Sequence, residues 1–315
     1  MIKKVIAVMF ASLFLLPFGV SAAQNGEGEK APQTIVISFA GDCTLGGDIQ
    51  SFGEARFAGV AEKEGYAYFL KNVEPIFSAD DYTVVNLETV LTTSEKKRAN
   101  RSFIFRGKPE YAKILTLGGV EAVTIANNHA NDFLDVGKAD TKKALNAEKI
   151  SYFGYEKETY ITIKGVRFGF IGLTEWDYTA EEVKERVEAA KKNCDMLIVE
   201  FHWGIERQYS PSKTQQILGR AAVDAGADLV VGQHPHVLGE TENYNGVNIV
   251  YSLGNFCYGG HSNPSDKDTA IFQQEFINDN GRVTLGDSRM IPCTLSSVSF
   301  TNDFCPTPKE EISEK

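Results

Sequence analysis

The segment Leu229-Val230-Val231-Gly232-Gln233-His234-Pro235-His236 joins a short apolar run to two histidines separated by one proline. Such a run, rich in β-branched residues, is typical of a strand that is buried on both faces of a parallel sheet. Proline restricts the backbone, and alternate residues of an extended segment face the same side. We therefore predict a buried strand that ends in an extended His-Pro-His segment, with both histidines available to one metal ion.

Four other apolar runs are also followed directly by polar residues. These are Ile35–Ala40 before Gly41-Asp42, Tyr82–Val85 before Asn86-Leu87-Glu88, Val123–Ala126 before Asn127-Asn128-His129, and Met196–Phe201 before His202-Trp203-Gly204. Side chains just past the carboxyl ends of neighbouring strands line a common crevice in α/β sheets. The mixture of nitrogen and oxygen donors favours Zn, Mn or Fe over Ca or Mg. The five strand ends therefore predict a divalent metal site.

Six side chains at these strand ends are candidate metal ligands, which is more than one tetrahedral ion requires. They are Asp42, Glu88, Asn128, His202, His234 and His236. Two ions about 3.5–4 Å apart could share a bridging carboxylate, for which Glu88 is the natural candidate. His129 is then free to act as the catalytic acid or base, with Asp132 to orient it. Glu206 and Asn255 are expected to support a ligand or to fix a loop.

Each of these motifs also has a purely structural interpretation. Asp42 could cap a turn, and Asn127 could cap the start of a helix. His202 and Trp203 could form a packed aromatic pair. His261, which lies in a polar loop, is expected to be solvated, with a substrate contact as the alternative.

Helix-like stretches alternate with the apolar runs, which predicts an α/β fold in a single domain over residues 34–300. The expected helices are Tyr111–Leu117, Val136–Ala147, Glu181–Lys192 and Thr214–Ala225, and further strands are Phe168–Leu173 and Ile249–Leu253. Hairpin signals at Lys164-Gly165 and Asn245-Gly246 interrupt the alternation, so the sheets should be mixed. The last two strands, Ala270–Ile277 and Arg282–Ile291, should form an antiparallel edge.

Residues 1–23 have the pattern of a signal peptide. Lys3 and Lys4 form a basic start, Val5–Val20 is apolar, and small residues follow. The pattern predicts an extracytoplasmic protein that is secreted, periplasmic or held at the cell surface, with a retained anchor helix as the alternative. Residues 24–33 are expected to form a flexible leader, and residues 301–315 a C-terminal tail.

The composition excludes several classes of function. The chain carries 32 Lys and Arg against 42 Asp and Glu, a formal net charge of −10, with no basic stripe to attract nucleic acid. It also lacks the phosphate-binding loop of nucleotide kinases and the G-x-S-x-G elbow of serine hydrolases. Of the five cysteines, Cys293 and Cys305 are the expected disulfide in an oxidising compartment, whereas Cys43 is expected to be a small buried apolar residue rather than a metal thiolate.

Six motifs resemble, in their order along the chain, those of the CapA-type poly-gamma-glutamate capsule biosynthesis family. They are Phe39-Ala40-Gly41-Asp42, Asn86-Leu87-Glu88, Asn127-Asn128-His129-Ala130-Asn131-Asp132, His202-Trp203-Gly204-Ile205-Glu206, Gly232-Gln233-His234-Pro235-His236 and Tyr251-Ser252-Leu253-Gly254-Asn255-Phe256. That family looks like a branch of the calcineurin-like metallophosphoesterase superfamily. The resemblance implies a metallophosphatase-like sandwich of two mixed β-sheets flanked by helices. It also implies a dinuclear site with the six ligands named above and His129 as the catalytic histidine.

Two residues depart from the superfamily pattern. Thr44 stands where the first motif has a histidine, and Glu88 stands where the bridging residue is usually aspartate. One ion thereby loses a strong nitrogen ligand, so the resemblance implies one tightly held metal and one weaker one. The family resemblance itself implies a role in making, exporting or trimming an anionic γ-linked glutamate polymer.

Three functions remain open at this point. The first is a metal-dependent hydrolase that acts on the polymer or on a phosphoester. The second is a non-catalytic assembly or export factor, which would bind the polymer through metal or through Arg98, Arg101 and Arg106 while membrane capsule-synthesis proteins act as partners. The third is a metal-assisted peptide epimerase that uses the same site.

Overall fold

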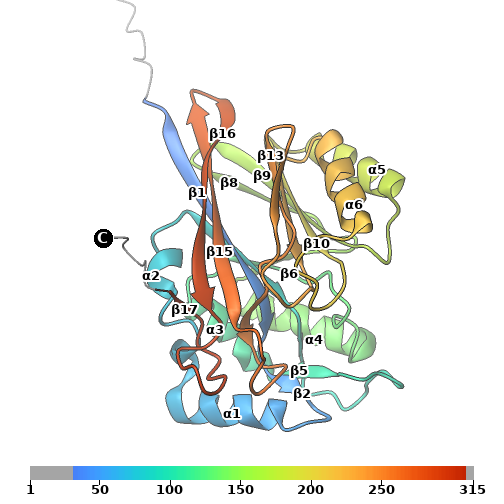
Figure 1. The fold of residues 1–315 in the computed structure, drawn as a ribbon, viewed down its shortest axis with the longest axis vertical. Coiled ribbons are helices and arrows are strands. Elements are labelled where there is room, and N and C mark those ends of the chain that lie inside the picture. Colours follow the sequence, from blue (N-terminus) through green and yellow to red (C-terminus); the bar gives the residue numbers. More distant parts are fainter. Residues whose placement is uncertain (1–30, 310–315) are drawn as a thin grey trace, which may run out of the picture. The chain divides into compact units, whose positions relative to one another are not determined.

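The computed structural model describes residues 31–309, so the expected signal peptide and nearly all of the leader lie outside the described residues. Two mixed β-sheets face each other, and helices cover their outer faces (Figure 1). The α/β sandwich expected from the sequence is confirmed. Among residues 31–309, no helix is both long enough and apolar enough to cross a membrane.

The first sheet has the strand order β17-β16-β15-β1-β3-β6-β7, and β14 pairs with the end of β1. Its strands are β1 Gln33–Thr44, β3 Tyr82–Leu87, β6 Ala122–Thr124, β7 Ser151–Phe153, β14 Asn255–Tyr258, β15 Asp268–Asp279, β16 Arg282–Thr294 and β17 Thr307–Pro308. The four strands from β1 to β7 are parallel, whereas β15, β16 and β17 form the expected antiparallel edge.

The second sheet has the order β12-β13-β11-β10-β9-β8. Its strands are β8 Thr159–Ile163, β9 Val166–Thr174, β10 Met196–His202, β11 Leu229–Gln233, β12 Thr241–Tyr244 and β13 Val247–Val250. The inner four are parallel, and β8 and β12 close the two edges as antiparallel hairpins. Both hairpin turns place two residues at positive φ, at Lys164-Gly165 and Asn245-Gly246, as a tight two-residue turn requires.

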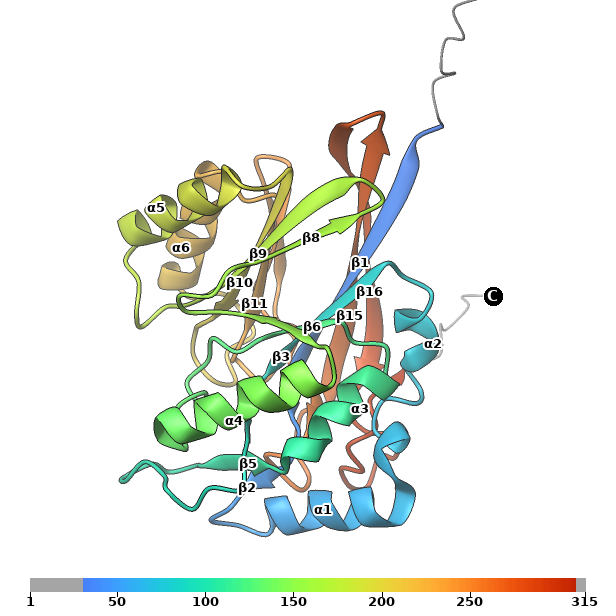
Figure 2. The ribbon, with the colours of Figure 1, turned by 180° about the vertical axis from the view of Figure 1, so that it is seen from behind.

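The main core lies between the two sheets, where Phe39, Phe170 and Val231 are fully buried. On the outer face of the second sheet lie α5 Ala180–Lys191 and α6 Lys213–Asp224. On the outer face of the first lie α1 Gly53–Glu64, α2 Glu74–Phe77, α3 Ala112–Leu117 and α4 Leu134–Ala147 (Figure 2). Central strands are therefore covered on both faces, which explains their nearly continuous apolar sequences.

The sequence did not predict α1 or a small third sheet beside it. That sheet consists of β2 Gly47–Asp48, β4 Val90–Leu91 and β5 Phe105–Gly107. Its strands have only two or three residues each, too few to show a period of alternation. Helix α1 buries only Gly53, Phe57 and Ala61, so its sequence shows only a weak helical pattern of apolar residues.

Two expectations at the C-terminus are corrected. Cys293 and Cys305 are both free thiols. The Sγ of Cys293 contacts the carbonyl of Ile291, and the Sγ of Cys305 contacts the carbonyl of Tyr68. Residues after 300 also belong to the packed domain, since the ring of Phe304 lies 5.2 Å from that of Phe57 and β17 pairs with β16. The domain therefore extends past the boundary expected at residue 300. As expected, Cys43 is buried in the core, and burial raises its pKa to about 12.

A bulge in β1 aims Asp42 into the molecule. The pairing of β1 with β3 shifts register between Ala40 and Asp42, so Gly41 is the extra residue. A Cβ at Gly41 would lie 1.9 Å from the carbonyl oxygen of Gly254, and that carbonyl accepts the backbone N–H of Asp42 at 2.9 Å. Only glycine permits this close approach of two backbones.

We predict that Gly41→Ala lowers the free energy of unfolding by about 2 kcal/mol or more, because the added methyl group would clash with fixed backbone atoms. The matched control is Gly59→Ala in α1, where nothing lies within 4 Å of the added Cβ. Removing glycine from an exposed helix interior should instead stabilise the protein by about 0.5–1 kcal/mol. Urea denaturation measures both changes, and a Gly41→Ala variant as stable as wild type would contradict the close-approach argument.

Candidate metal centre

The ends of five strands meet on one side of the sandwich, as the sequence predicts. Asp42 stands in β1, Glu88 directly after β3, His202 at the end of β10 and His234 directly after β11, and all four side chains are buried. His236 completes the group from the segment that follows β11. Parallel neighbours in each sheet share the same direction, so their polar carboxyl ends come together at one edge.

Asn86 joins the contributions of the two sheets. Its amide nitrogen lies 2.6 Å from Asp42 Oδ1 and 3.2 Å from His202 Nδ1. Its own Oδ1 accepts a hydrogen bond from the amide of Asn127 at 3.1 Å. The side chain is fully buried, so these contacts fix the rotamers of both candidate ligands.

The His-Pro-His segment reaches the centre, but not in the extended form that we predicted. His234 has φ of 96° and His236 has φ of 58°, so both residues adopt left-handed conformations in a bent segment. Such conformations cost free energy and persist only where surrounding contacts hold them. Here the backbone N–H of His234 donates to Asp42 Oδ2 at 3.3 Å, and Asn255 binds both the ring and the carbonyl of His236.

Glu88 is the least satisfied group in the centre. Both of its carboxylate oxygens are buried and lack a hydrogen-bond partner among the described residues. Burial and the nearby charge of Asp42 raise the pKa of Glu88 to about 8. Glu88, His234 and His236 each offer a ligand atom within 4.8 Å of the other two, and His234 Nδ1 also lacks a partner. Oxygen and imidazole donors left without partners at this spacing fit a divalent transition metal.

The three histidines of the centre differ in the direction in which their surroundings shift the pKa. Burial lowers the pKa of His202 to about 3 and that of His234 to about 2, so both rings are neutral, the form that binds metal. Burial also disfavours the charged form of His236, but the carboxylates of Glu88 and Asp42 raise its pKa to about 10. Burial alone would raise the pKa of Asp42, yet its contacts with His236 and the charge of His202 bring it below the usual value.

Asn128, His129 and Asp132 occupy the loop after β6. Asn128 Oδ1 lies 3.0 Å from His202 Nε2, which places this candidate ligand at the centre. His129 Nδ1 lies 2.7 Å from Asp132 Oδ2, and the same carboxylate oxygen accepts the backbone N–H of Phe105 at 2.8 Å. The ring of Phe105 stacks on that of His129 at 4.0 Å. His129 is thus held in one orientation from two sides.

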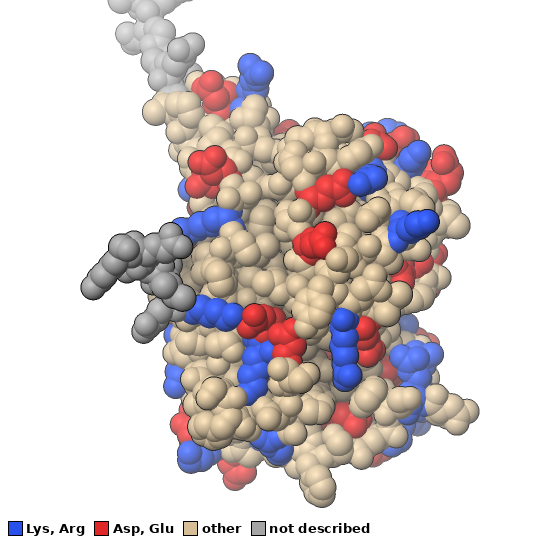
Figure 3. Space-filling model, in the orientation of Figure 1, with Lys and Arg blue, Asp and Glu red and all other residues tan. Residues whose placement is uncertain are grey.

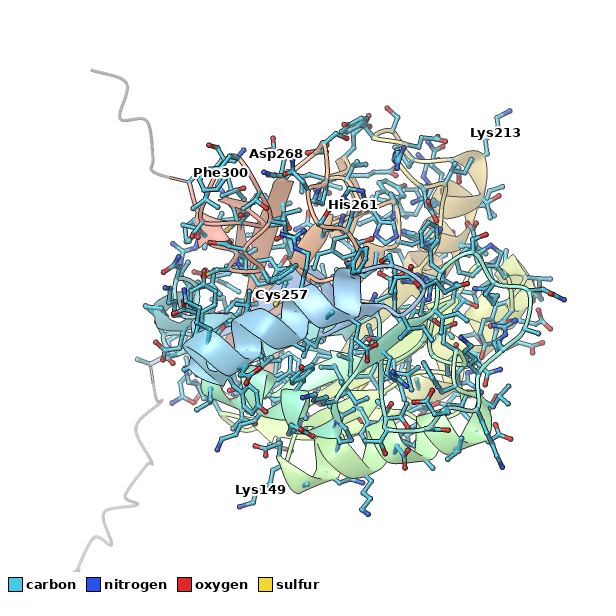
Figure 4. All side chains as sticks on the ribbon, turned by 90° about the horizontal axis from the view of Figure 1, so that it is seen from below. Lys149, Lys213, Cys257, His261, Asp268 and Phe300 are labelled. Atoms are coloured by element: carbon cyan, nitrogen blue, oxygen red, sulfur yellow. The ribbon has the colours of Figure 1, made fainter. Side chains whose placement is uncertain are left out.

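A pocket of about 430 Å³ opens beside the centre. Its walls include His129, His236, Asn255 and Tyr258, together with Glu206, Arg207 and His261. Glu206 is exposed and faces this pocket, whereas Asn255 contacts His236 directly. His261 also borders the pocket, on the same side of the domain as Asp268 (Figure 4).

Sequence reasoning missed two residues of the centre. Asn86 could have been found, because alternation along β3 places it on the same face as Glu88. Trp176 could not, since it lies in the loop after β9 with no local signal; its ring lies 5.1 Å from that of His234 and 5.9 Å from that of His202. The aromatic pair suggested for His202 and Trp203 does not form, because Trp203 stacks on Phe201 under the helices of the second sheet.

Comparisons with known proteins identify the family of this chain. A family model described as bacterial capsule synthesis protein PGA_cap matches residues 36–259. The chain belongs to this family. PGA biosynthesis protein CapA of Bacillus subtilis (strain 168) is 30% identical over 284 residues, which cover 81% of this chain and 73% of that protein. Capsule biosynthesis protein CapA of Bacillus anthracis is 29% identical over 295 residues, which cover 84% and 68%. The family resemblance expected from the six motifs is confirmed.

One solved structure bears on the fold of this PGA_cap member. A hypothetical protein from Thermus thermophilus superposes with a TM-score of 0.50 at 15% sequence identity, covering 82% of this chain and 99% of that protein. At this identity the likeness shows the fold alone.

We predict that Asp132→Ala lowers the free energy of unfolding by about 1–3 kcal/mol, because it removes the acceptor that the buried N–H of Phe105 and the ring of His129 share. Asp287→Ala on the exposed face of β16 is the matched control and should change stability by less than about 0.5 kcal/mol. Urea denaturation measures both. Equal effects of the two substitutions would show that Asp132 does not hold the loop.

Proposed function

We propose that this PGA_cap protein is an exported metal-dependent hydrolase of the poly-gamma-glutamate pathway. The observation that carries the proposal is Glu88, a buried carboxylate without hydrogen-bond partners among the described residues that faces His234 and His236. Its nearest basic groups, His202 Nε2 at 3.4 Å and His236 Nδ1 at 3.9 Å, do not hydrogen-bond to it. Burial disfavours a carboxylate with so few partners, so the site favours a compensating cation. Export rests on the sequence of residues 1–23.

The chain supplies the ligands from both sheets. Glu88, His234 and His236 would hold one ion, and Asp42, Asn128 and His202 lie where they would hold or share a second. A bound divalent ion would supply Lewis-acid polarisation of the scissile group and a water acidified for attack. Trp176 lies against His202 and His234 and partly screens their rings from solvent.

His129 is the residue placed to move a proton. It borders the pocket beside the centre, and its Nδ1 is bonded to Asp132, which leaves Nε2 for a leaving group. The stacked ring of Phe105 holds the imidazole plane fixed. The bond that best matches the family is the γ-glutamyl amide of the polymer, and a phosphoester is the alternative substrate.

A non-catalytic role in polymer assembly is the second candidate, and Thr44 favours it. The hydroxyl of Thr44 is buried without a hydrogen-bond partner among the described residues, and no imidazole occupies its position to strengthen a second ion. The arginines suggested for polymer binding are less available than the sequence implies. Arg106 pairs with Glu54 and Glu95 at 2.8 Å each, and Arg101 lies 3.3 Å from the carbonyl of Asn128.

The first test is the metal content of the purified mature protein by elemental analysis. We expect Mn, Fe or Zn in wild type and its loss in His234→Ala, because His234 offers an unpartnered nitrogen to the ion. His261→Ala is the matched control, since His261 borders the pocket without joining the ligand group, and this variant should keep the metal. A folded His234→Ala protein with a full complement of metal would refute the ligand assignment.

The second test separates hydrolase from assembly factor. We expect His129→Ala to retain metal and to lose roughly 10²–10⁴-fold in the rate at which γ-linked glutamate oligomers are shortened. A chelator should abolish the same activity in wild type, and addition of the removed metal should restore it. Chromatography of the oligomers measures the rate. Unchanged oligomers with metal-loaded wild type, together with retained polymer binding, would favour the assembly factor.

A further inference from the structure

A second pocket lies behind the loop that carries Asn128 and His129. It has a volume of about 330 Å³ and is formed by α4, the ends of β3 and β6, and the turn after β7. Leu87, Ile125 and Ala130 form apolar walls. Three lysines also line it, Lys138 and Lys142 on α4 and Lys157 on the opposite turn. Helix α4 faces the viewer in Figure 2.

The charge of this pocket is positive, although the chain as a whole is acidic. None of the three lysines has a carboxylate partner within 4.0 Å in the described part of the chain. The one glutamate of the pocket, Glu156, pairs with Arg186 at 3.0 Å, so its charge is already matched. Elsewhere lysines and acids are interspersed, as Figure 3 shows for the face in the view of Figure 1.

Beneath the pocket lies a buried hydroxyl that the fold leaves without a partner. Thr89 is 2% exposed and lines the pocket, and its hydroxyl has no hydrogen-bond partner among the described residues. A buried hydroxyl without a partner costs free energy unless a ligand or water satisfies it. The pocket thus combines apolar walls with lysines around them, above this buried hydroxyl.

We propose that this pocket binds carboxylates of a γ-linked glutamate chain as an accessory site beside the metal centre. Lys138 and Lys142 stand four residues apart on one helix face, so their charges are neighbours. Lys157 lines the pocket from the turn after β7, and its Nζ lies 4.9 Å from the centre of the Tyr152 ring. A γ-linked glutamate chain repeats a carboxylate and a short aliphatic spacer, which matches alternating lysines and apolar walls. The volume is at the lower end for a ligand site and suits a short segment of chain rather than a large molecule.

The pocket and the centre share structural elements. Leu87 precedes the candidate ligand Glu88, and Ala130 follows His129. The hydroxyl of Tyr155 in the pocket donates to the carbonyl of Asn127 at 2.8 Å. A polymer held here would therefore lie against the back of the catalytic loop. This inference rests on the proposed substrate but not on hydrolysis.

The test is binding of a fluorescent γ-linked glutamate oligomer, measured by anisotropy on the full mature protein at low and moderate salt. We expect the triple variant Lys138→Gln/Lys142→Gln/Lys157→Gln to bind at least about tenfold more weakly. The control Lys143→Gln/Lys192→Gln/Lys213→Gln removes the same charge from exposed positions outside the pocket and should bind as wild type. Lys213 and α4 lie on opposite sides in Figure 4.

Thr89→Val provides a second variant that keeps the shape of the side chain. We expect unchanged oligomer binding with unchanged or greater stability, because the buried hydroxyl has no partner among the described residues to lose and the lysines supply the attraction. An α-linked glutamate oligomer and inorganic phosphate serve as competitors, and both should compete less well than the γ-linked oligomer. Competition by phosphate at the same concentration would assign the pocket to phosphate and overturn the proposal.

Further outcomes separate this inference from the proposed function. Equal weakening in both triple variants would show a general charge effect, and it would overturn the accessory site. Loss of binding only in His234→Ala would place the polymer at the metal centre alone. This result would also overturn the accessory site, while the hydrolase proposal would stand. Binding that depends on Lys138, Lys142 and Lys157 without any cleavage by wild type would support the pocket and reject the hydrolase.

Discussion

The burial of two carboxylates at the meeting point of the two sheets is the constraint on which the rest of this structure depends. A charge removed from water must be paired, and Asp42 is paired with Asn86, His236 and a backbone N–H. Glu88 accepts no hydrogen bond among the described residues and has only the rings of His202 and His236 nearby, at 3.4 and 3.9 Å. Burial and the charge of Asp42 raise its pKa to about 8. The fold holds this carboxylate at 0% exposure, which costs free energy. A bound cation would offset that cost.

The backbone around the two carboxylates is irregular, with a bulge at Gly41 and left-handed conformations at His234 and His236. At the bulge, Gly41 lies against Gly254. A regular continuation of β1 or β11 would turn these side chains with the period of the strand, toward the packed core of the sandwich. The irregular geometry instead turns Asp42 and both histidines to one point. Strained residues of this kind tend to collect where ligands bind.

Much of this fold was predictable because buried parallel strands have a strong sequence signature. Runs such as Met196–Phe201 and Leu229–Val231 predict a buried strand, and the polar residue that follows each run marks the end of that strand. The conformation of the His-Pro-His segment was not predictable, since long-range contacts to Asp42 and Asn255 decide it. Helix α1 and Trp176 escaped because their positions depend on tertiary packing. The free thiols of Cys293 and Cys305 show the same limit, because pairing depends on distances that the sequence does not contain.

If the proposed acidic polymer is the ligand, the distribution of charge gives the metal centre and the lysine-lined pocket different roles. With a net charge of −10, the surface as a whole repels a polyanion, so attraction must be local. At the centre a cation would supply it, and behind the loop of Asn128 and His129 the proposed supply is Lys138, Lys142 and Lys157, without metal. Two weak contacts on one chain raise the effective concentration of the second after the first forms. Under the proposed function, a polymer held by its carboxylates in the lysine-lined pocket would therefore remain close to the metal centre.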